Sequence, residues 1–243
     1  METMDMIVRR ADDLMGGGDW DGAERVFLAA LRDAETAGDT RMALSLCSEL
    51  MGFYRQRGMA EKFYTVFDRC GELLGIVRPG ALARGTILIN AATALCAFGE
   101  AAWALPLFRE AEELYAAALD AEHPRLAALW NNMAAALDAL GRPDEAEKLM
   151  RRALAQQIKR PGDLDAAVTY VNLAQHYAAQ NAHDGRIAGC LDAAMERMDS
   201  PDAVWAYYYA HTARKIAPAL EALGRAAAAQ DLRERADMIY EGT

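Results

Sequence analysis

Residues 123–154 read HPRLAALWNNMAAALDALGRPDEAEKLMRRAL, and Gly141 separates two amphipathic patterns within them. On both sides of this glycine, apolar residues recur at intervals of three and four, which is the periodicity of one helix face. Before it stand Leu126, Leu129, Trp130, Met133, Leu137 and Leu140. After it stand Ala146, Leu149, Met150, Ala153 and Leu154. The stretch therefore predicts a helix–turn–helix hairpin.

The residues around Gly141 suit the end of one helix and the start of the next. Glycine readily adopts the left-handed conformation that ends many helices. Pro143 suits a first helical turn, where its missing N–H group would have no partner in any case. Asp144 and Glu145 suit the positive end of the helix dipole.

The hairpin recurs along the chain, because candidate turn residues follow one another at intervals of 40 to 43 residues. They are Gly18, Gly58, Gly99, Gly141, Asn181 and Gly224. Asparagine is the usual substitute for glycine at a helix end. Seven positions before them stand Ala11, Met51, Ala92, Ala134, Ala174 and Ala217, and five positions after them stand Ala23, Phe63, Ala104, Ala146 and Ala229, with Ile187 one position late. A fixed period with small residues in phase predicts a repeat protein whose paired helices approach closely.

This pattern resembles the tetratricopeptide repeat (TPR). The matching motif residues are Trp130, Ala134, Leu137, Gly141, Ala146, Met150 and Ala153. The period near 42, the runs 129–134 and 145–147, and Pro106 seven residues after a turn are most similar to the kinesin-light-chain-like variety. The resemblance implies a superhelix of helix pairs, in a family that includes scaffolds, peptide sensors and adaptor subunits.

We therefore expect an all-α protein, a right-handed α-α superhelical solenoid of six TPR-like helix pairs in a single domain over residues 1–243. The pairs are expected at about residues 4–36, 40–75, 79–119, 124–159, 163–198 and 201–241. In the last pair, Ser200, Pro201 and Asp202 supply the cap, first-turn proline and first-turn acid of a helix start. That helix is expected to reach Leu223 and to be the longest.

Charge and composition narrow the classes of partner and compartment. The net charge of −10 argues against binding to nucleic acid or to an anionic membrane, because phosphate contacts need clustered Lys and Arg. No apolar run is long enough to span a bilayer, and the acidic N-terminus lacks the apolar segment of a signal peptide. Cys47, Cys70, Cys96 and Cys190 form no Cys-x-x-Cys pair and fall in different repeats. We expect reduced thiols and a cytoplasmic protein.

The sequence contains no recognisable catalytic motif, so we predict a protein that is not an enzyme and holds no cofactor. No metalloprotease, nucleophile-elbow, Walker or Rossmann pattern is present. His176 and His183 lie seven residues apart beside Asp184, and a metal could be imagined there. Turn and surface histidines are far commoner than ligands, so we predict no metal site.

An asparagine series is the strongest functional signal. Nine positions before the turn residues stand Arg9, Glu49, Asn90, Asn132, Asn172 and Lys215. The resemblance implies that this position lies on the concave face, where asparagines in related families hold a peptide backbone. A carboxamide can bond both the N–H and the C=O of an extended chain. The predicted peptide-binding residues are Asn90, Thr93, Asn131, Asn132, Asp138, Asn172 and Gln175.

Two questions stay open at the level of sequence. The asparagines could instead bond neighbouring helices, since buried polar groups need partners either way. The aromatic run at 205–211 predicts a possible interface of Trp205, Tyr208 and Tyr209, or else packing against the preceding helix. Paired basic residues that would clamp a C-terminal carboxylate are not repeated, and Arg214 and Lys215 alone could serve.

We predict a non-catalytic scaffold or adaptor that binds a peptide or protein segment in its concave groove. An internal segment is favoured over a C-terminal tail. The alternative is a structural or assembly subunit that self-associates, for instance as a homodimer, through its aromatic C-terminal region.

Overall fold

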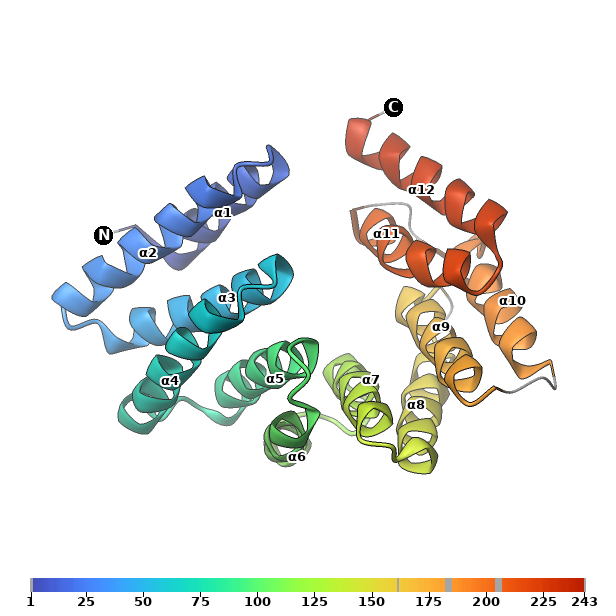
Figure 1. The fold of residues 1–243 in the computed structure, drawn as a ribbon, viewed down its shortest axis with the longest axis horizontal. Helices are drawn as coiled ribbons and strands as arrows, with labels where there is room; N and C mark the ends of the chain where they lie inside the picture. Colours follow the sequence, from blue (N-terminus) through green and yellow to red (C-terminus); the bar gives the residue numbers. More distant parts are fainter. Residues whose placement is uncertain (1, 161, 182–184, 204–206, 243) are drawn as a thin grey trace. The chain divides into compact units, whose positions relative to one another are not determined.

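The computed structural model describes residues 2–160, 162–181, 185–203 and 207–242, and within these ranges the chain forms twelve α-helices and no strand (Figure 1). Each odd-numbered helix packs most closely against the helix that follows it, which gives six pairs. The predicted all-α repeat of six helix pairs is confirmed.

The contacts between helices divide the chain into two compact units, here called the N-terminal unit (residues 1–119) and the C-terminal unit (residues 120–243). The N-terminal unit contains α1 (Met4–Gly16), α2 (Trp20–Thr36), α3 (Thr40–Arg57), α4 (Ala60–Val77), α5 (Ala81–Ala97) and α6 (Ala101–Ala118). The C-terminal unit contains α7 (Pro124–Ala139), α8 (Pro143–Gln157), α9 (Leu164–Ala179), α10 (Arg186–Met198), α11 (Tyr207–Ala222) and α12 (Ala226–Glu241). A single domain over the whole chain stays a prediction.

The six predicted turn residues all adopt the left-handed conformation. Their φ angles are 82° at Gly18, 65° at Gly58, 87° at Gly99, 69° at Gly141, 55° at Asn181 and 83° at Gly224. Glycine adopts such an angle without steric cost, and asparagine tolerates it better than most residues. The recurring turn is therefore set by the backbone freedom of one residue in each repeat.

The small residues that stand in phase with these turns are buried where paired helices meet. All six residues at the position seven before the turn are fully buried, from Ala11 to Ala217. In the second pair the larger Met51 and Phe63 occupy the two positions, and Phe63 fills its space by ring contact with Phe98 at 5.1 Å. In the C-terminal unit the core runs from Leu164 through α10 and α11 to Ala236.

The predicted helix start at Ser200 is wrong. Residues 201–203 form a turn, in which the Ser200 hydroxyl accepts a hydrogen bond from the Asp202 N–H at 3.2 Å. This bond has the geometry of a helix cap, but residues 201–203 do not continue as a helix. The turn also packs closely against Gly162. A Cβ placed on Gly162 would lie only 2.2 Å from the Asp202 carbonyl oxygen. The described part of α11 spans Tyr207–Ala222. Residues 204–206 lie outside the described residues, so the expectation that this helix is the longest stays a prediction.

Other predicted helix starts differ in outcome. Asp163 caps α9 as expected, its carboxylate accepting from the Asp165 N–H at 2.9 Å. His183 and Asp184, which were considered above as metal ligands, lie outside the described residues. None of the helices described combines the length and the apolar character that crossing a bilayer requires.

The thiols are expected to be reduced and slow to react while the chain is folded. All four cysteines are free, and Cys47 and Cys70 are buried. Burial raises the pKa of Cys47 to about 11 and that of Cys70 to about 12, above the ordinary 9.0. At pH 8 the thiolate fraction at a pKa of about 11 is roughly a hundredfold below that at 9.0. A thiol reagent should therefore modify these two slowly in the folded chain, and all four rapidly after denaturation without prior reduction. A cysteine that reacts only after reduction would contradict this expectation.

Candidate functional site

The C-terminal unit contains an open pocket of about 490 Å³, here called the amide pocket. Residues from α7 and α9 form most of it, with Met150 and Gln157 from α8 and Lys215 from α11. Its polar lining is Asn131, Asn132, Asp138, Gln157, Asp165, Asn172, Gln175, His176 and Lys215. Five of these side chains are carboxamides, which suits hydrogen bonding to groups that both donate and accept.

Most of the predicted peptide-binding residues meet in this pocket. Asn131, Asn132, Asp138, Asn172 and Gln175 all line it, although they come from two different helices. Asn132, Asn172 and Lys215 occupy the same repeat position, nine residues before the turn, in α7, α9 and α11. Successive helix pairs therefore present this position to one shared surface.

The Asn131 side chain makes its hydrogen bonds within the protein. Its Nδ2 group donates to the Thr169 hydroxyl at 2.7 Å and to the Ala127 carbonyl at 3.3 Å, and its Oδ1 accepts from Asn172 Nδ2 at 3.3 Å. The Thr169 hydroxyl in turn donates to Oε1 of the buried Gln157 at 2.7 Å. Asn131 therefore joins α7 to α9, as the structural alternative for these asparagines requires.

Other side chains of the amide pocket keep their hydrogen-bonding capacity. Within the part of the chain that the structure describes, Asn132, Gln175 and Lys215 have no hydrogen bond and no ion pair. The Asn172 side chain uses one N–H for Asn131, and its carbonyl oxygen accepts no bond from the described residues. These groups can bond a ligand without first breaking a bond within the protein.

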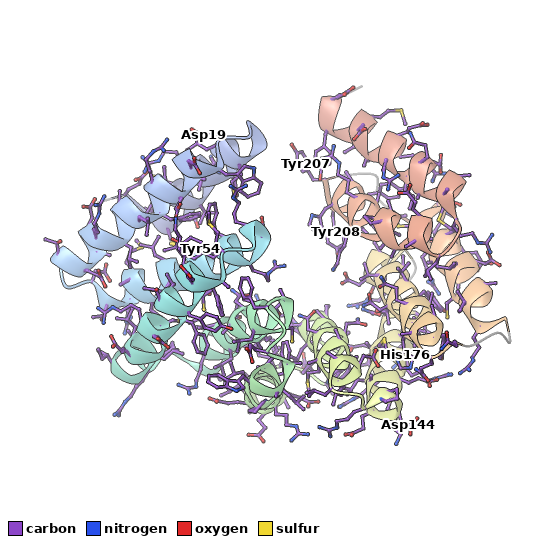
Figure 2. All side chains as sticks on the ribbon, in the orientation of Figure 1. Asp19, Tyr54, Asp144, His176, Tyr207 and Tyr208 are labelled. Carbon is purple, nitrogen blue, oxygen red and sulfur yellow. The ribbon has the colours of Figure 1, made fainter. Side chains whose placement is uncertain are left out.

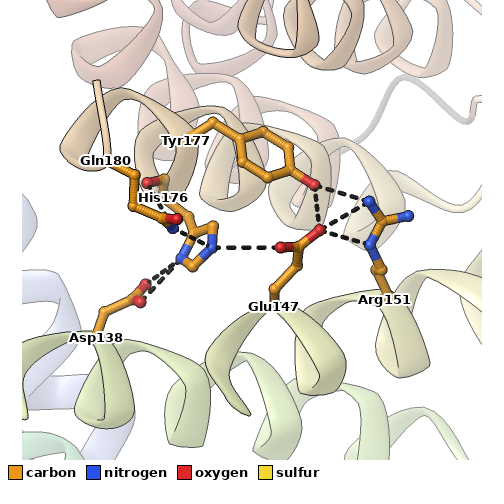
Figure 3. A network of polar contacts seen from close by, with 6 residues as sticks. All are labelled: Asp138, Glu147, Arg151, His176, Tyr177 and Gln180. Atoms are coloured by element: carbon orange, nitrogen blue, oxygen red, sulfur yellow. Dashed lines mark hydrogen bonds and ion pairs between the residues drawn. The ribbon is translucent and has the colours of Figure 1, made fainter. Parts of the chain in front are cut away.

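His176 links the pocket to a network of polar contacts (Figure 3). Its side chain is only 3% exposed, which differs from the turn or surface location that the sequence favoured. Nδ1 lies 2.8 Å and 2.9 Å from the two Asp138 carboxylate oxygens, and Nε2 lies 2.5 Å from Gln180 Nε2. With the proton on Nδ1, the ring donates to Asp138 and accepts from Gln180. His176 therefore fixes the position of the Asp138 carboxylate at the pocket wall.

Glu147 extends the network to α8 and clamps this helix to α9. Its Oε1 accepts hydrogen bonds from the Tyr177 hydroxyl at 2.8 Å and from Arg151 Nε at 2.8 Å. Burial opposes ionisation of Glu147, but these two hydrogen bonds outweigh it and hold the pKa below its ordinary value. Burial and the bond to Glu147 raise the pKa of Tyr177. At neutral pH Glu147 is therefore ionised and Tyr177 protonated, so the hydrogen bond between them is kept.

The two predicted residues of the N-terminal unit do not belong to the amide pocket. Asn90 on α5 donates from Nδ2 to the Ser48 hydroxyl on α3 at 2.9 Å. It therefore joins neighbouring helices, as the structural alternative requires. Thr93 is half-buried on the same helix. A role for either residue in binding a peptide stays a prediction.

The aromatic run on α11 is divided between the core and the surface. Tyr209 is 0% exposed and belongs to the core, so its prediction as an exposed interface residue is corrected. Tyr208 is exposed, but its hydroxyl donates to Asp165; burial and this bond raise its pKa. Trp205 lies outside the described residues. The sequence reasoning left out Tyr207, which is 72% exposed and lies beside Tyr208 at the start of α11 (Figure 2).

No group of three or more residues able to hold a metal ion occurs in the described ranges. The fold and the pocket instead define an α-helical repeat protein with an amide-lined surface. The sequence model of the tetratricopeptide repeat family matches residues 83–159 and 125–185, and helix pairs of the same kind continue on both sides of these ranges. The chain is a tetratricopeptide repeat protein.

Solved structures share this fold. BtubC (BKLC) from P. vanneervenii is 23% identical, with a TM-score of 0.68 over 79% of this chain and 78% of that chain. A putative kinesin light chain with TPR-like repeats from Podosopora anserina is 22% identical, with a TM-score of 0.56 over 84% and 96%. MamA is 16% identical, with a TM-score of 0.51 over 77% and 93%. No curated protein sequence matches the chain. The predicted TPR fold, including its kinesin-light-chain-like resemblance, is confirmed, and a protein of this fold is in general a scaffold for protein–protein interaction.

Proposed function

We propose that the chain binds an extended peptide or protein segment in the amide pocket, without catalysis. One observation carries the proposal: the carboxamides of Asn132, Asn172 and Gln175 line one pocket with unused hydrogen-bonding capacity. An unsatisfied amide facing a pocket can bond a peptide backbone at little cost to the fold. The volume of about 490 Å³ falls within the range of roughly 300–1,000 Å³ that is typical of binding sites.

Lys215 in the amide pocket can pair with an acidic side chain of a bound segment. Asp138 accepts a hydrogen bond from His176, and Asp165 accepts one from Tyr208. The Lys215 ammonium has no ion pair within the described residues. The two carboxylates of the lining already accept hydrogen bonds, whereas Lys215 is a charged group of the lining without a hydrogen bond or ion pair among the described residues. A carboxylate of the bound segment can pair with Lys215.

A selection from a random displayed peptide library tests the proposal, with the intact chain as bait. We expect the selected peptides to contain an Asp or Glu at a recurrent position. Their affinity should fall when Lys215 is replaced by Glu, and it should be preserved when Arg214, which pairs with Asp237, is replaced by Glu. Selected peptides that bind equally to both variants, or a selection that yields no binder, would count against the amide pocket as the binding site.

A second candidate function is self-association through α11 and α12, and one observation favours it. Tyr207 is exposed and lies edge-on to Tyr240, with ring centroids 5.2 Å apart, while the Arg214 guanidinium lies 4.2 Å from the Tyr240 ring centroid. Exposed aromatic and Arg side chains in one cluster are typical of protein interfaces.

If this cluster is an interface between two copies, Tyr207→Glu should weaken the dimer at least about tenfold, because a charge would replace a buried ring. Light scattering across a concentration series measures the change. Trp103→Glu is a matched control, since Trp103 is a similarly exposed aromatic residue on α6 of the N-terminal unit. An unmutated chain that stays monomeric at high concentration would remove this candidate.

A further inference from the structure

The N-terminal unit contains a second, smaller hollow of about 220 Å³, separate from the amide pocket and here called the α4–α6 hollow. Residues of α4 and α5 form most of its lining, and Leu107 of α6 completes it. Its walls are almost entirely apolar and include Phe67, Leu74, Ile87, Leu88 and Leu107. Cys70 also lines it, and burial raises the pKa of this thiol to about 12, so it acts as an apolar group.

Gly71 leaves the hollow open. It stands thirteen positions after the turn residue Gly58, where the first and fourth repeats carry Leu31 and Leu154, both half-buried. A Cβ placed on Gly71 would meet no atom within 4 Å. The leucine of the first and fourth repeats is therefore absent here, in the middle of a helix where glycine lowers stability.

Two further features mark the hollow as an interaction surface. Trp103 is 66% exposed and stands one helical turn before Leu107, so it lies on the same face of α6 as a wall of the hollow. An exposed tryptophan beside an apolar hollow is typical of a protein interface. The one acidic side chain of the lining, Asp68, has no ion pair or hydrogen bond among the described residues.

We propose that the α4–α6 hollow docks a basic amphipathic helix of a partner protein. One large aliphatic side chain of that helix enters the hollow at Gly71, Trp103 covers it, and a Lys or Arg pairs with Asp68. The volume lies below the roughly 300–1,000 Å³ of small-molecule sites, and it suits one or two side chains. The two flanking helices of 18 residues offer an edge about 27 Å long, which matches a docked helix. The charge of −10 on the chain favours a basic partner.

A designed peptide probes this surface directly. The probe is a labelled 18-residue peptide with Leu on one helix face and Lys elsewhere, and its control has Ser in place of every Leu. Fluorescence anisotropy at 0.15 M salt should show binding of the Leu–Lys peptide and little binding of the Ser–Lys peptide. Equal binding of the two peptides would overturn the proposal, because the binding would then be due to charge attraction alone. Absence of binding by the Leu–Lys peptide would also overturn it.

Gly71→Leu separates blocked binding from loss of fold. Filling the hollow should weaken the Leu–Lys peptide at least about tenfold, while removal of a mid-helix glycine should raise Tm by roughly 2–4 °C. Gly75→Ala is the matched control, because Gly75 is exposed one turn later on α4, outside the hollow, and its Cβ would also meet no atom within 4 Å. This variant should raise Tm and keep full affinity. A Gly71→Leu chain that binds as well as the unmutated one would overturn the proposal.

Substitutions at the edge of the α4–α6 hollow test which side chains contact the peptide. Trp103→Ala and Asp68→Asn should each weaken the Leu–Lys peptide several-fold. Ile76→Ala should have no effect, because Ile76 is 63% exposed on α4 but does not line the hollow. Asn132→Ala, in the amide pocket, should also leave this binding unchanged. A peptide whose affinity falls only in Asn132→Ala occupies the other site, and that result would overturn the proposal without affecting the function assigned to the amide pocket.

Discussion

Replacement of Asn132 by alanine is expected to lower the affinity for a selected peptide about ten- to a hundredfold and to leave Tm unchanged. The Asn132 carboxamide has no hydrogen bond within the described residues, so its removal breaks nothing in the fold. If it bonds the peptide backbone, the lost bonds are worth about 1–3 kcal/mol. A binding titration and a thermal melt of the same variant measure the two quantities.

Asn131→Ala is the matched control, because it removes the same carboxamide one residue earlier in the chain. This change leaves Asn172 Nδ2 without its acceptor and Thr169 without its donor. Groups that lose their partners in a half-buried site cost about 1–3 kcal/mol, so Tm should fall by roughly 2–10 °C. The reverse pattern, with a destabilised Asn132→Ala chain that binds normally, would contradict the proposed function.

Replacement of Tyr209 by alanine is expected to destabilise the C-terminal unit strongly. Tyr209 is fully buried in the core formed by α9 to α12, and the loss of a buried aromatic ring costs about 3–5 kcal/mol. The corresponding fall in Tm is roughly 6–20 °C. Tyr209→Glu should be worse still, because it places a carboxylate in the same apolar site. Thermal and urea unfolding followed by circular dichroism measure both changes.

Two neighbouring variants locate the cause of this effect. Tyr209→Phe keeps the ring and removes the hydroxyl that accepts from Arg235 Nη1 at 3.1 Å, so it should cost only about 1 kcal/mol. Tyr208→Ala should cost much less than Tyr209→Ala, because the Tyr208 ring is exposed. If the Tyr209→Ala chain is stable but fails to dimerise, Tyr209 is an interface residue and this expectation is wrong.

The fold could be predicted from the sequence because each repeat carries its own local signal. Gly141 and its equivalents must adopt a left-handed conformation, and Ala134 and its equivalents must be small, wherever the chain repeats the hairpin. The start of α11 was less predictable. Ser200, Pro201 and Asp202 favour a helix locally, but contact between Asp202 and Gly162 depends on residues about forty positions apart. A local pattern contains no information on such a contact.

The site was predictable in position but not in role. The repeat register correctly placed Asn132 and Asn172 on one surface. It could not tell that Asn131 would be used between helices while its neighbour Asn132 would face the pocket unbonded, since a rotation of 100° along a helix separates these outcomes. Consecutive tyrosines on α11 show the same limit, because Tyr208 is exposed and Tyr209 is buried. The hollow at Gly71 depends on the absence of a side chain, which no sequence motif marks.

The hydrogen bonds around Asn131 give the amide pocket an electrical polarity. Asn172 donates to Asn131, Asn131 donates to Thr169, and Thr169 donates to the buried Gln157, so the group dipoles are aligned head to tail along the pocket wall. Aligned hydrogen bonds polarise one another. Donation through its N–H increases the electron density on the Asn172 carbonyl oxygen, at the pocket end of the series. If a segment binds in the amide pocket as we propose, Asn172 should hold its N–H groups more strongly than its carbonyl groups, and the buried Thr169 should contribute to that preference without contacting the ligand.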